Sequence, residues 1–428
     1  MPDDADVTRR APYATNPSVG ARGAKTRRKI MEASLVALDE HGYAATTVER
    51  ITKKAGCSRV AFYQYFVDKD DVYRRLGGHL AKLLAEALAE LGPITPDQAG
   101  LDNLVAYIER RAAIHADYGS MFRAFSATER SDQVFAGGAS RIGQEQNAVF
   151  ISKIAPTGIR PKQLEATVAL LISSISRTFD VANNLTRVAP EHFPAERVHH
   201  ALARVIHRTL FGPAFIDEHP LDWGPVPAIH IPPAAQDVFA KVTELEREAA
   251  RPDRRALAGL LQVGTQVVVA RGYQATRVED LVTAADISHG AFYRYFQNKH
   301  EFVRTLAAKA LSVISATFGE APSAGPDRQA LQKWLRRFQA VLQEHGAIIQ
   351  VWNEAGRNDD VFRSDEPAFM DWGRRQMAHV IGRRGFGDPD MEALVMLNAV
   401  EVFGNGPKSS DQLEAMVRII ERGLLGAA

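Results

Sequence analysis

The sequence is poor in cysteine and in long apolar runs. Cys57 is the single cysteine among 428 residues, which excludes an intrachain disulfide framework and a metal site made only of cysteines and fits a reducing compartment. No stretch reaches the roughly 18 uninterrupted apolar residues of a membrane helix, and the N-terminal residues lack the apolar run of a secretory signal. We therefore expect a cytoplasmic protein with no membrane partner.

An excess of one charge sign is also missing. The 52 Lys and Arg residues nearly balance the 51 Asp and Glu residues, for a net charge of +1, so the overall charge does not point to nucleic acid. Two segments depart from this balance: residues 20–75 hold 12 basic and 7 acidic residues, and residues 250–306 hold 8 and 5. These excesses favour two local anion-binding surfaces, although solvated helix faces explain them equally well.

Signatures of catalysis are absent from the sequence. The histidines, among them His199, His200 and His207, lack metal-ligand spacing to Cys or Glu, and no HExxH, GxSxG or phosphate-loop motif occurs. The acidic pair Asp359 and Asp360 adjoins no aligned nucleophile or base. We therefore expect no enzyme activity, no metal and no cofactor.

What the sequence does contain is an internal repeat. Residues 42–76 align without a gap to residues 272–306, at an offset of 230, and 16 of the 35 positions are identical. Residues 204–214 also align without a gap to residues 418–428, at an offset of 214, with 6 of 11 identical. A unit of about 170–190 residues is too long for a solenoid repeat, so the chain is a duplicated domain.

Apolar residues recur at helical spacing throughout both copies, and strand-like alternation is rare. We predict an all-α fold of two tandem units, each with an N-terminal three-helix head and a C-terminal helical body. Five prolines between the copies predict an extended linker, followed by a lead-in helix near residues 235–250. The predicted parts are a flexible basic N-terminal arm (1–24), the first head (25–76), body one (77–214), the linker with its lead-in helix (215–250), the second head (251–306) and body two (307–428).

Each head carries the pattern of a helix-turn-helix. In the first, a helix over residues 26–41 ends at Gly42, and Thr46 is placed to cap a short helix over residues 48–55. A turn at Gly56 needs positive φ, and Ser58 caps a third helix over residues 59–66. In the second head the matching helices cover residues 254–271, 278–285 and 289–296, and Asp286 takes the place of the turn glycine.

The third helix of each head is predicted to read DNA. Phe62 and Phe66 are four residues apart and should face the core. Arg59 can hydrogen-bond guanine, and Val60 and Ala61 can contact a thymine methyl group, whereas the tyrosines and the following lysine suit phosphate oxygens. The predicted DNA-binding residues are Thr46, Thr47, Ser58, Arg59, Val60, Ala61, Tyr63, Gln64, Tyr65 and Lys69 in the first head, and Thr276, Arg277, Ser288, His289, Gly290, Ala291, Tyr293, Arg294, Tyr295 and Lys299 in the second.

These two segments resemble the DNA-binding domain of TetR-family transcriptional regulators. The resemblance rests on the capping threonine, the Ala-Gly-x-Ser turn, the aromatic-Tyr-x-Tyr-Phe helix and the lysine after it, and covers residues 25–76 and 255–306. It implies that Thr47, Arg59, Val60, Tyr63, Tyr65 and Lys69 contact DNA, and that each body takes part in dimerisation and holds an effector pocket. Asp286 and the presence of two copies depart from the usual family pattern, and the chain resembles the rarer tandem members that act as single-chain pseudo-dimers.

The bodies contain aromatic and polar residues that either line a pocket or belong to the core. A small apolar effector is the expected ligand if they line a pocket. The candidates are His115, Tyr118, Phe122, Phe125, Phe150, Arg177 and Asn183 in body one, and Trp334, Trp352, Phe362, Trp372, Met396 and Asn398 in body two.

The sequence thus predicts a DNA-binding regulator, a repressor released by its effector, that acts as a pseudo-dimer on an asymmetric operator. In the alternative hypothesis only the first repeat binds DNA, and the second is a degenerate module for dimerisation and ligand sensing. Two further questions stay open. Cys57 is either a redox sensor or a small core residue, and the basic N-terminal arm either follows the DNA or makes no contact with it.

Overall fold

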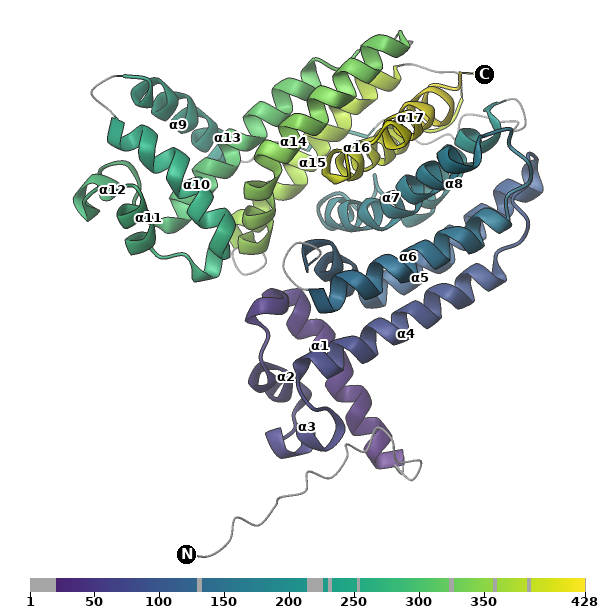
Figure 1. The fold of residues 1–428 in the computed structure, drawn as a ribbon, viewed down its shortest axis with the longest axis horizontal. Coiled ribbons are helices and arrows are strands. Elements are labelled where there is room, and N and C mark those ends of the chain that lie inside the picture. The colour runs from purple at the N-terminus through teal and green to yellow at the C-terminus, as the bar shows by residue number, and fades with distance from the viewer. Residues whose placement is uncertain are drawn as a thin grey trace, which may run out of the picture. The chain divides into compact units, whose positions relative to one another are not determined.

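The computed structural model describes residues 21–128, 133–213, 226–229, 233–251, 255–322, 327–356, 360–382 and 386–427 (Figure 1). Within these ranges the regular structure is helical, and the one strand-like feature is an isolated bridge between Ile94 and Ile154. The predicted all-α class is therefore confirmed. The predicted N-terminal arm, up to residue 20, lies outside the described residues, as do linker residues 214–225 and 230–232.

The helices of the second repeat follow in the same order as those of the first. The first repeat contains α1 (Ala21–Ala45), α2 (Val48–Ala55), α3 (Arg59–Tyr65), α4 (Lys69–Glu90), α5 (Gln98–Thr128), α6 (Gln133–Ser152), α7 (Pro161–Val188) and α8 (Ala195–Phe211). After the additional helix α9 (Pro233–Ala249), the second contains α10 (Arg255–Ala275), α11 (Val278–Ala284), α12 (His289–Tyr295), α13 (Lys299–Gly319), α14 (Arg328–Gly356), α15 (Asp360–Ile381), α16 (Pro389–Asn405), α17 (Ser410–Arg418) and a final π-helical segment, η4 (Ile419–Leu424). Helix α9 confirms the predicted lead-in helix.

The chain divides into two compact units. One holds residues 1–86 and 114–143, and the other holds residues 87–113 and 144–428. In the first unit, α2 packs on α1 and α3 packs on α2. Buried Ile30, Leu38, Ile51, Phe62 and Phe66 form the core of this first head.

In the second unit, the second head shares its core with its neighbours. Phe292, Phe296 and Phe302 are buried together with Leu245 from α9 and Trp352 from α14. Helix α9 packs on α10 and α13, and α14 packs on α10 and α13. Helices α9 and α14 therefore cover the apolar residues of the second head.

Helices of the two repeats also pack together in the second unit. Helix α16 packs on α7 and α8 of the first repeat, α17 packs on α7, and η4 packs on α8 (Figure 1). Every residue from 391 to 400 of α16 is buried. Burying a complete helix on all sides requires partners around it, and α16 has them in both repeats.

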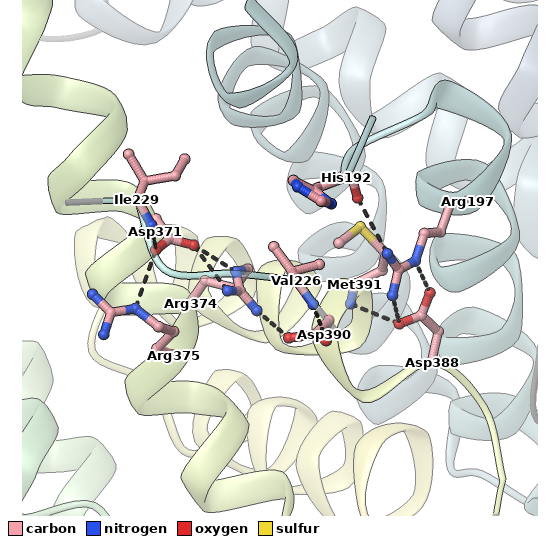
Figure 2. A network of polar contacts seen from close by, with 10 residues as sticks. All are labelled: His192, Arg197, Val226, Ile229, Asp371, Arg374, Arg375, Asp388, Asp390 and Met391. Carbon is pink, nitrogen blue, oxygen red and sulfur yellow. Dashed lines mark hydrogen bonds and ion pairs between the residues drawn. The ribbon is translucent and has the colours of Figure 1, made fainter. Parts of the chain in front are cut away.

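A short described piece of the linker, residues 226–229, is fixed to body two by acidic side chains. The backbone N–H of Val226 donates to Asp390 at 3.1 Å, and that of Ile229 donates to Asp371 at 2.9 Å. Arg374 pairs with both carboxylates (Figure 2). Arg375 pairs with Asp371 as well, so two arginines balance the two acids while the acid oxygens hold the linker backbone in place.

Candidate nucleic-acid interface

The two short helices of the first head are set by their ends. Helix α1 is interrupted at Gly42 (φ 69°) and the turn after α2 contains Gly56 (φ 64°), both in the left-handed region that glycine enters freely. The side chain of Ser58 accepts a hydrogen bond from the N–H of Ala61 at 3.0 Å and so caps α3. The predicted turn chemistry is confirmed at these positions.

The predicted cap of α2 at Thr46 is wrong. Thr47 is the N-cap, and its side chain accepts from the N–H of Arg50 at 3.3 Å. Thr46 is buried, and its hydroxyl shares its one hydrogen between the carbonyls of Gly42, at 2.7 Å, and Ala37, at 3.1 Å, both in α1. Its side chain stabilises the junction of α1 and α2 from inside, so it does not face DNA as predicted.

In the second head the predicted cap, Thr276, also lies inside, and the start of α11 is capped by a different group. Thr276 is buried and donates to the carbonyl of Gly272 at 2.7 Å. The N-cap of α11 is Arg277, whose N–H donates to the Asp280 carboxylate at 2.8 Å. This backbone hydrogen bond is the main cause that lowers the pKa of Asp280, and Arg271 lowers it further. A capping carboxylate thus replaces the threonine cap of the first head.

Helix α3 separates a buried side from an exposed one. Phe62 and Phe66 are fully buried, as predicted from their spacing. Arg59 and Gln64 are exposed, and so are the apolar Val60 and the aromatic Tyr63, at 71% and 47%. Val60 is thus an exposed apolar group of the kind that can contact a thymine methyl group.

Residues 281–300 of the second head, which include α12, show the same pattern of burial, residue for residue, as residues 51–70 of the first head. Asp286 adopts φ 52° and so performs the turn that Gly56 performs in the first head. The sequence departure at this position therefore does not disrupt the motif. Gly290 lies in open space, where an added Cβ would meet only the Ser288 hydroxyl, at 3.8 Å.

The lysines predicted to bind phosphate also hold each head together. The ammonium group of Lys69 donates to the carbonyls of Tyr43 and Thr46 at 3.0 and 3.2 Å, and lies 4.4 Å from the Tyr43 ring centre. Lys299 makes the same contacts with the carbonyls of Tyr273 and Thr276, at 2.7 and 2.8 Å. Partial burial lowers the pKa of Lys299. Each lysine ties the start of α4 or α13 to the end of the first helix of its head.

Cys57 is partly buried beside this motif, and burial raises the pKa of its thiol. Its counterpart Ile287 packs against the core of the second head. A raised pKa leaves less of the reactive thiolate, which favours the core interpretation over the redox sensor.

Many of the ligand candidates in the bodies are core residues. Phe150, Trp334, Trp352, Met396 and Asn398 are buried. The indole N–H of Trp334 donates to the carbonyl of Thr317 at 2.8 Å, and the Asn398 amide donates to that of Leu394 at 2.7 Å. Their apolar pattern reflects packing between helices at least as much as any pocket.

The other candidates occupy different environments. His115 is buried and stacks on Phe122, and Tyr118 is partly buried beside His79. Trp372 is partly buried with its ring at the edge of Phe318. Asn183 is exposed. The side chains of Phe125 and Phe362 lie outside the described residues.

Arg177 belongs to a set of contacts between the repeats that the sequence analysis missed. It pairs with Glu401 at 3.0 Å. Arg197 forms a two-pronged pair with Asp388, and Arg208 pairs with Glu392 at 2.5 Å, both buried (Figure 2 shows the first). In each pair the arginine comes from the first repeat and the carboxylate from α16 or its N-cap. The sequence does carry one sign of these pairs. The first turn of α16 contains acidic residues, whereas the first turn of α7, the matching helix of the first repeat, contains none.

In the described part of the chain, no group of three or more His, Cys, Asp or Glu residues could hold a metal ion. None of the helices in this part is both long enough and apolar enough to span a membrane.

Comparison with known proteins matches both heads to one family. The family model for bacterial regulatory proteins of the tetR family matches residues 30–76 and again residues 260–306. The HTH-type transcriptional repressor DhaR of Mycobacterium sp. (strain GP1) is 32% identical over 111 residues, which make up 25% of this chain and 55% of that protein. The repressor AcnR of Corynebacterium glutamicum is 28% identical over 118 residues, which make up 28% of this chain and 58% of that protein. The chain thus spans about half the length of these curated relatives.

Proposed function

The chain belongs to the tetR family of bacterial regulatory proteins, and from this we propose that it is a sequence-specific DNA-binding regulator, a repressor that a small effector releases from its operator. The exposed face of α3, with Arg59, Val60, Tyr63 and Gln64 around a buried Phe62, carries this proposal. Such a face offers hydrogen-bond donors and apolar contacts to the major groove, where base pairs are distinguishable. The matched repressors DhaR and AcnR support the same direction of regulation.

We further propose that the two repeats act as the two halves of a dimer within one chain. The packing of α7 and α8 on α16, α17 and η4 supports this, because it joins the repeats through a shared core. The buried pairs Arg197–Asp388 and Arg208–Glu392 support it as well. A buried charge needs a partner of opposite sign, and here the partner comes from the other repeat.

In this proposal the effector acts on the arrangement of the two packed repeats. A ligand that binds a body changes the DNA affinity only if it prefers one arrangement of the heads over another. Moving the population from almost fully competent to almost fully incompetent takes about 5.5 kcal/mol of differential affinity. The buried aromatic residues of the bodies make a largely apolar effector the best fit to the surroundings.

The alternative, in which only the first repeat binds DNA, has one observation in its favour. Gly290 offers no side chain at the position where the first head presents Val60. Matched tyrosines separate the two hypotheses, because Tyr63 and Tyr293 are both exposed at the same place in their motifs. Tyr63→Ala and Tyr293→Ala would each be compared with the unmodified full chain in gel-shift titrations on DNA fragments that the chain selects from the genome.

We expect both variants to weaken binding by a similar factor, because each removes one phosphate contact from a two-headed complex. Lys82→Ala, an exposed change on α4, serves as the control and should have no effect. If Tyr293→Ala binds like the unmodified chain while Tyr63→Ala does not, the second head does not read DNA. If neither change matters, the assignment of both helices to DNA is wrong.

A further inference from the structure

Body one contains a buried arginine that differs from the others. Among the described residues, four arginines are buried: Arg111, Arg197, Arg208 and Arg374. Three of them pair with carboxylates, namely Asp388, Glu392, and Asp371 with Asp390. Arg111, at 4% exposure, forms no ion pair with any described residue.

The partners of Arg111 are neutral hydroxyl groups. Its guanidinium donates to the Tyr107 hydroxyl at 3.1 Å, one turn earlier on α5, and to the Ser176 hydroxyl on α7 at 3.2 Å. The Tyr107 ring centre lies 5.8 Å from the guanidinium carbon and 5.6 Å from the ring centre of buried Phe150. A guanidinium has five N–H donors, so the two hydroxyls accept only some of its possible hydrogen bonds. Because they are neutral, they do not balance its positive charge.

The fold itself does not need this charge. Helices α5 and α14 begin at Gln98 and Arg328, so they keep the offset of 230 that relates the two heads. At that offset, the counterpart of Arg111 in body two is Val341. A buried cation without a counter-charge is costly, and the matching body is built with an apolar residue at the same place. A role in binding explains why body one keeps the arginine.

We propose that Arg111 anchors the anionic group of the effector, and that the effector of body one is a monocarboxylic acid. This rests on the proposed function in assuming a ligand-responsive body. One buried positive charge balances one negative charge, which favours a monocarboxylate over a phosphate dianion. The planar guanidinium matches a carboxylate with two parallel hydrogen bonds, and the Tyr107 and Phe150 rings offer an apolar wall to the rest of the acid.

The test compares acids with their neutral amides on the full chain. Melting temperatures are measured with octanoate and phenylacetate, and with octanamide and phenylacetamide. The variants are Arg111→Met, which removes the charge, Arg111→Lys, which keeps it, and Arg110→Met as the control. Arg110 is the neighbouring residue on α5 but is exposed and pairs with Glu90. The same ligands are then added to the complex of the chain with DNA that it selects.

We expect at least one acid to raise the melting temperature of the unmodified chain and of Arg110→Met by about 2 °C or more at a hundredfold excess over its Kd, and its amide to bind at least tenfold more weakly. Arg111→Met should lose this preference and Arg111→Lys should keep part of it. Without ligand, Arg111→Met should melt at or above the temperature of the unmodified chain, because it removes an uncompensated charge.

Two results would overturn the proposal. One is that the acids and the amides stabilise the unmodified chain equally, or that none of them stabilises it. The other is a large drop in the melting temperature of ligand-free Arg111→Met, which would mark Arg111 as a structural residue. A failure of the proposed function is distinguishable, because a chain that binds no DNA can still show the preference for acids in melting.

Discussion

Helices α3 and α12 share their buried residues and differ at the exposed residues that we propose to face bases. Phe62 and Phe66 in the first head correspond to Phe292 and Phe296 in the second, and all four are buried. On the exposed side, Arg59 and Val60 correspond to His289 and Gly290. The buried phenylalanines are thus the same in both helices, whereas the hydrogen-bonding and apolar groups on their exposed sides differ.

Replacing Arg59 by alanine tests whether this residue reads a base. We expect a loss of about 1–3 kcal/mol in binding and a relaxed preference at one base pair, as for a two-pronged contact with guanine. Gel-shift titrations against operators changed at single positions measure both effects. A uniform loss on all operators would instead place Arg59 on the phosphate backbone.

The Lys69→Ala variant separates a phosphate contact from a structural one. Because the ammonium group of Lys69 donates to the carbonyls of Tyr43 and Thr46, its removal should destabilise the first head by about 1.5–3 kcal/mol, the range for hydrogen bonds to a charged group. Thermal unfolding measures this, with Lys82→Ala as the exposed control. If stability is unchanged and only the salt dependence of DNA binding becomes shallower, the lysine acts on phosphate alone.

The cap of α2 shows what sequence reasoning cannot resolve at this scale. Thr46 and Thr47 are adjacent and chemically identical, and the backbone after Gly42 decides which one turns inward. In the second head only Thr276 remains, and it takes the inner position, while a carboxylate from Asp280 replaces the cap. The threonine that both copies share is therefore the inner one, Thr46 or Thr276, and the position of the cap differs between them.

At the scale of elements, the short helices of the heads were predicted almost to the residue. Gly56, Ser58 and Ser288 mark their ends through backbone conformation and local hydrogen bonds, which depend only on neighbours in sequence. The long helices of the bodies have apolar residues that serve packing on several partners. Sequence periodicity therefore located these helices but could not tell core residues such as Trp334 and Asn398 from pocket residues.

Helix α8 contains a histidine that should make stability depend on pH. His207 is fully buried, and its Nε2 donates to the carbonyl of Thr95 at 2.8 Å. Burial is the main cause that lowers its pKa below the ordinary value of about 6.5. The unfolded chain therefore takes up a proton at a higher pH than the folded chain does, and the stabilisation present above about pH 6.5 is lost as the pH falls below it.

The His207→Gln variant should remove part of this pH dependence. Melting temperatures between pH 5 and 8 measure it, with His200→Gln as the control, since His200 lies on the same helix with a more exposed side chain. His199, whose pKa is also lowered by burial, stays in both variants. Equal slopes in the two variants would show that His207 carries no pH dependence.

At the scale of the whole molecule, the repeats are complementary rather than identical. Arg197 and Arg208 of the first repeat find their carboxylates at the start of α16. Helix α7, at the corresponding place in the first repeat, follows Arg160 and has no acidic residue in its first turn. A symmetric pair of first repeats would therefore bury these arginines without the carboxylates of α16 and its N-cap, which disfavours homodimers through this face.

A double-mutant cycle on Arg208 and Glu392 measures this complementarity. Arg208→Met alone and Glu392→Leu alone should each cost about 3–5 kcal/mol, because each removes one partner of an ion pair that has no exposure to water. The double variant should lose less than the sum of the two. Denaturant unfolding gives the three values, and simple additivity would mean that the pair does not couple the repeats.

The most direct test of the account is selection of binding sites from random DNA duplexes by the full chain. If one chain acts as a pseudo-dimer, the selected sites contain two unlike half-sites, because Arg59, Val60 and Gln64 stand opposite His289, Gly290 and Arg294. Their centres lie about 34–36 Å apart or a multiple of this, since operator spacing follows the spacing of the heads, and each site binds one 47.0 kDa chain. Recovery of a perfect inverted repeat with both halves equally protected would contradict the account, because it would mean that two first heads from separate chains bind the DNA.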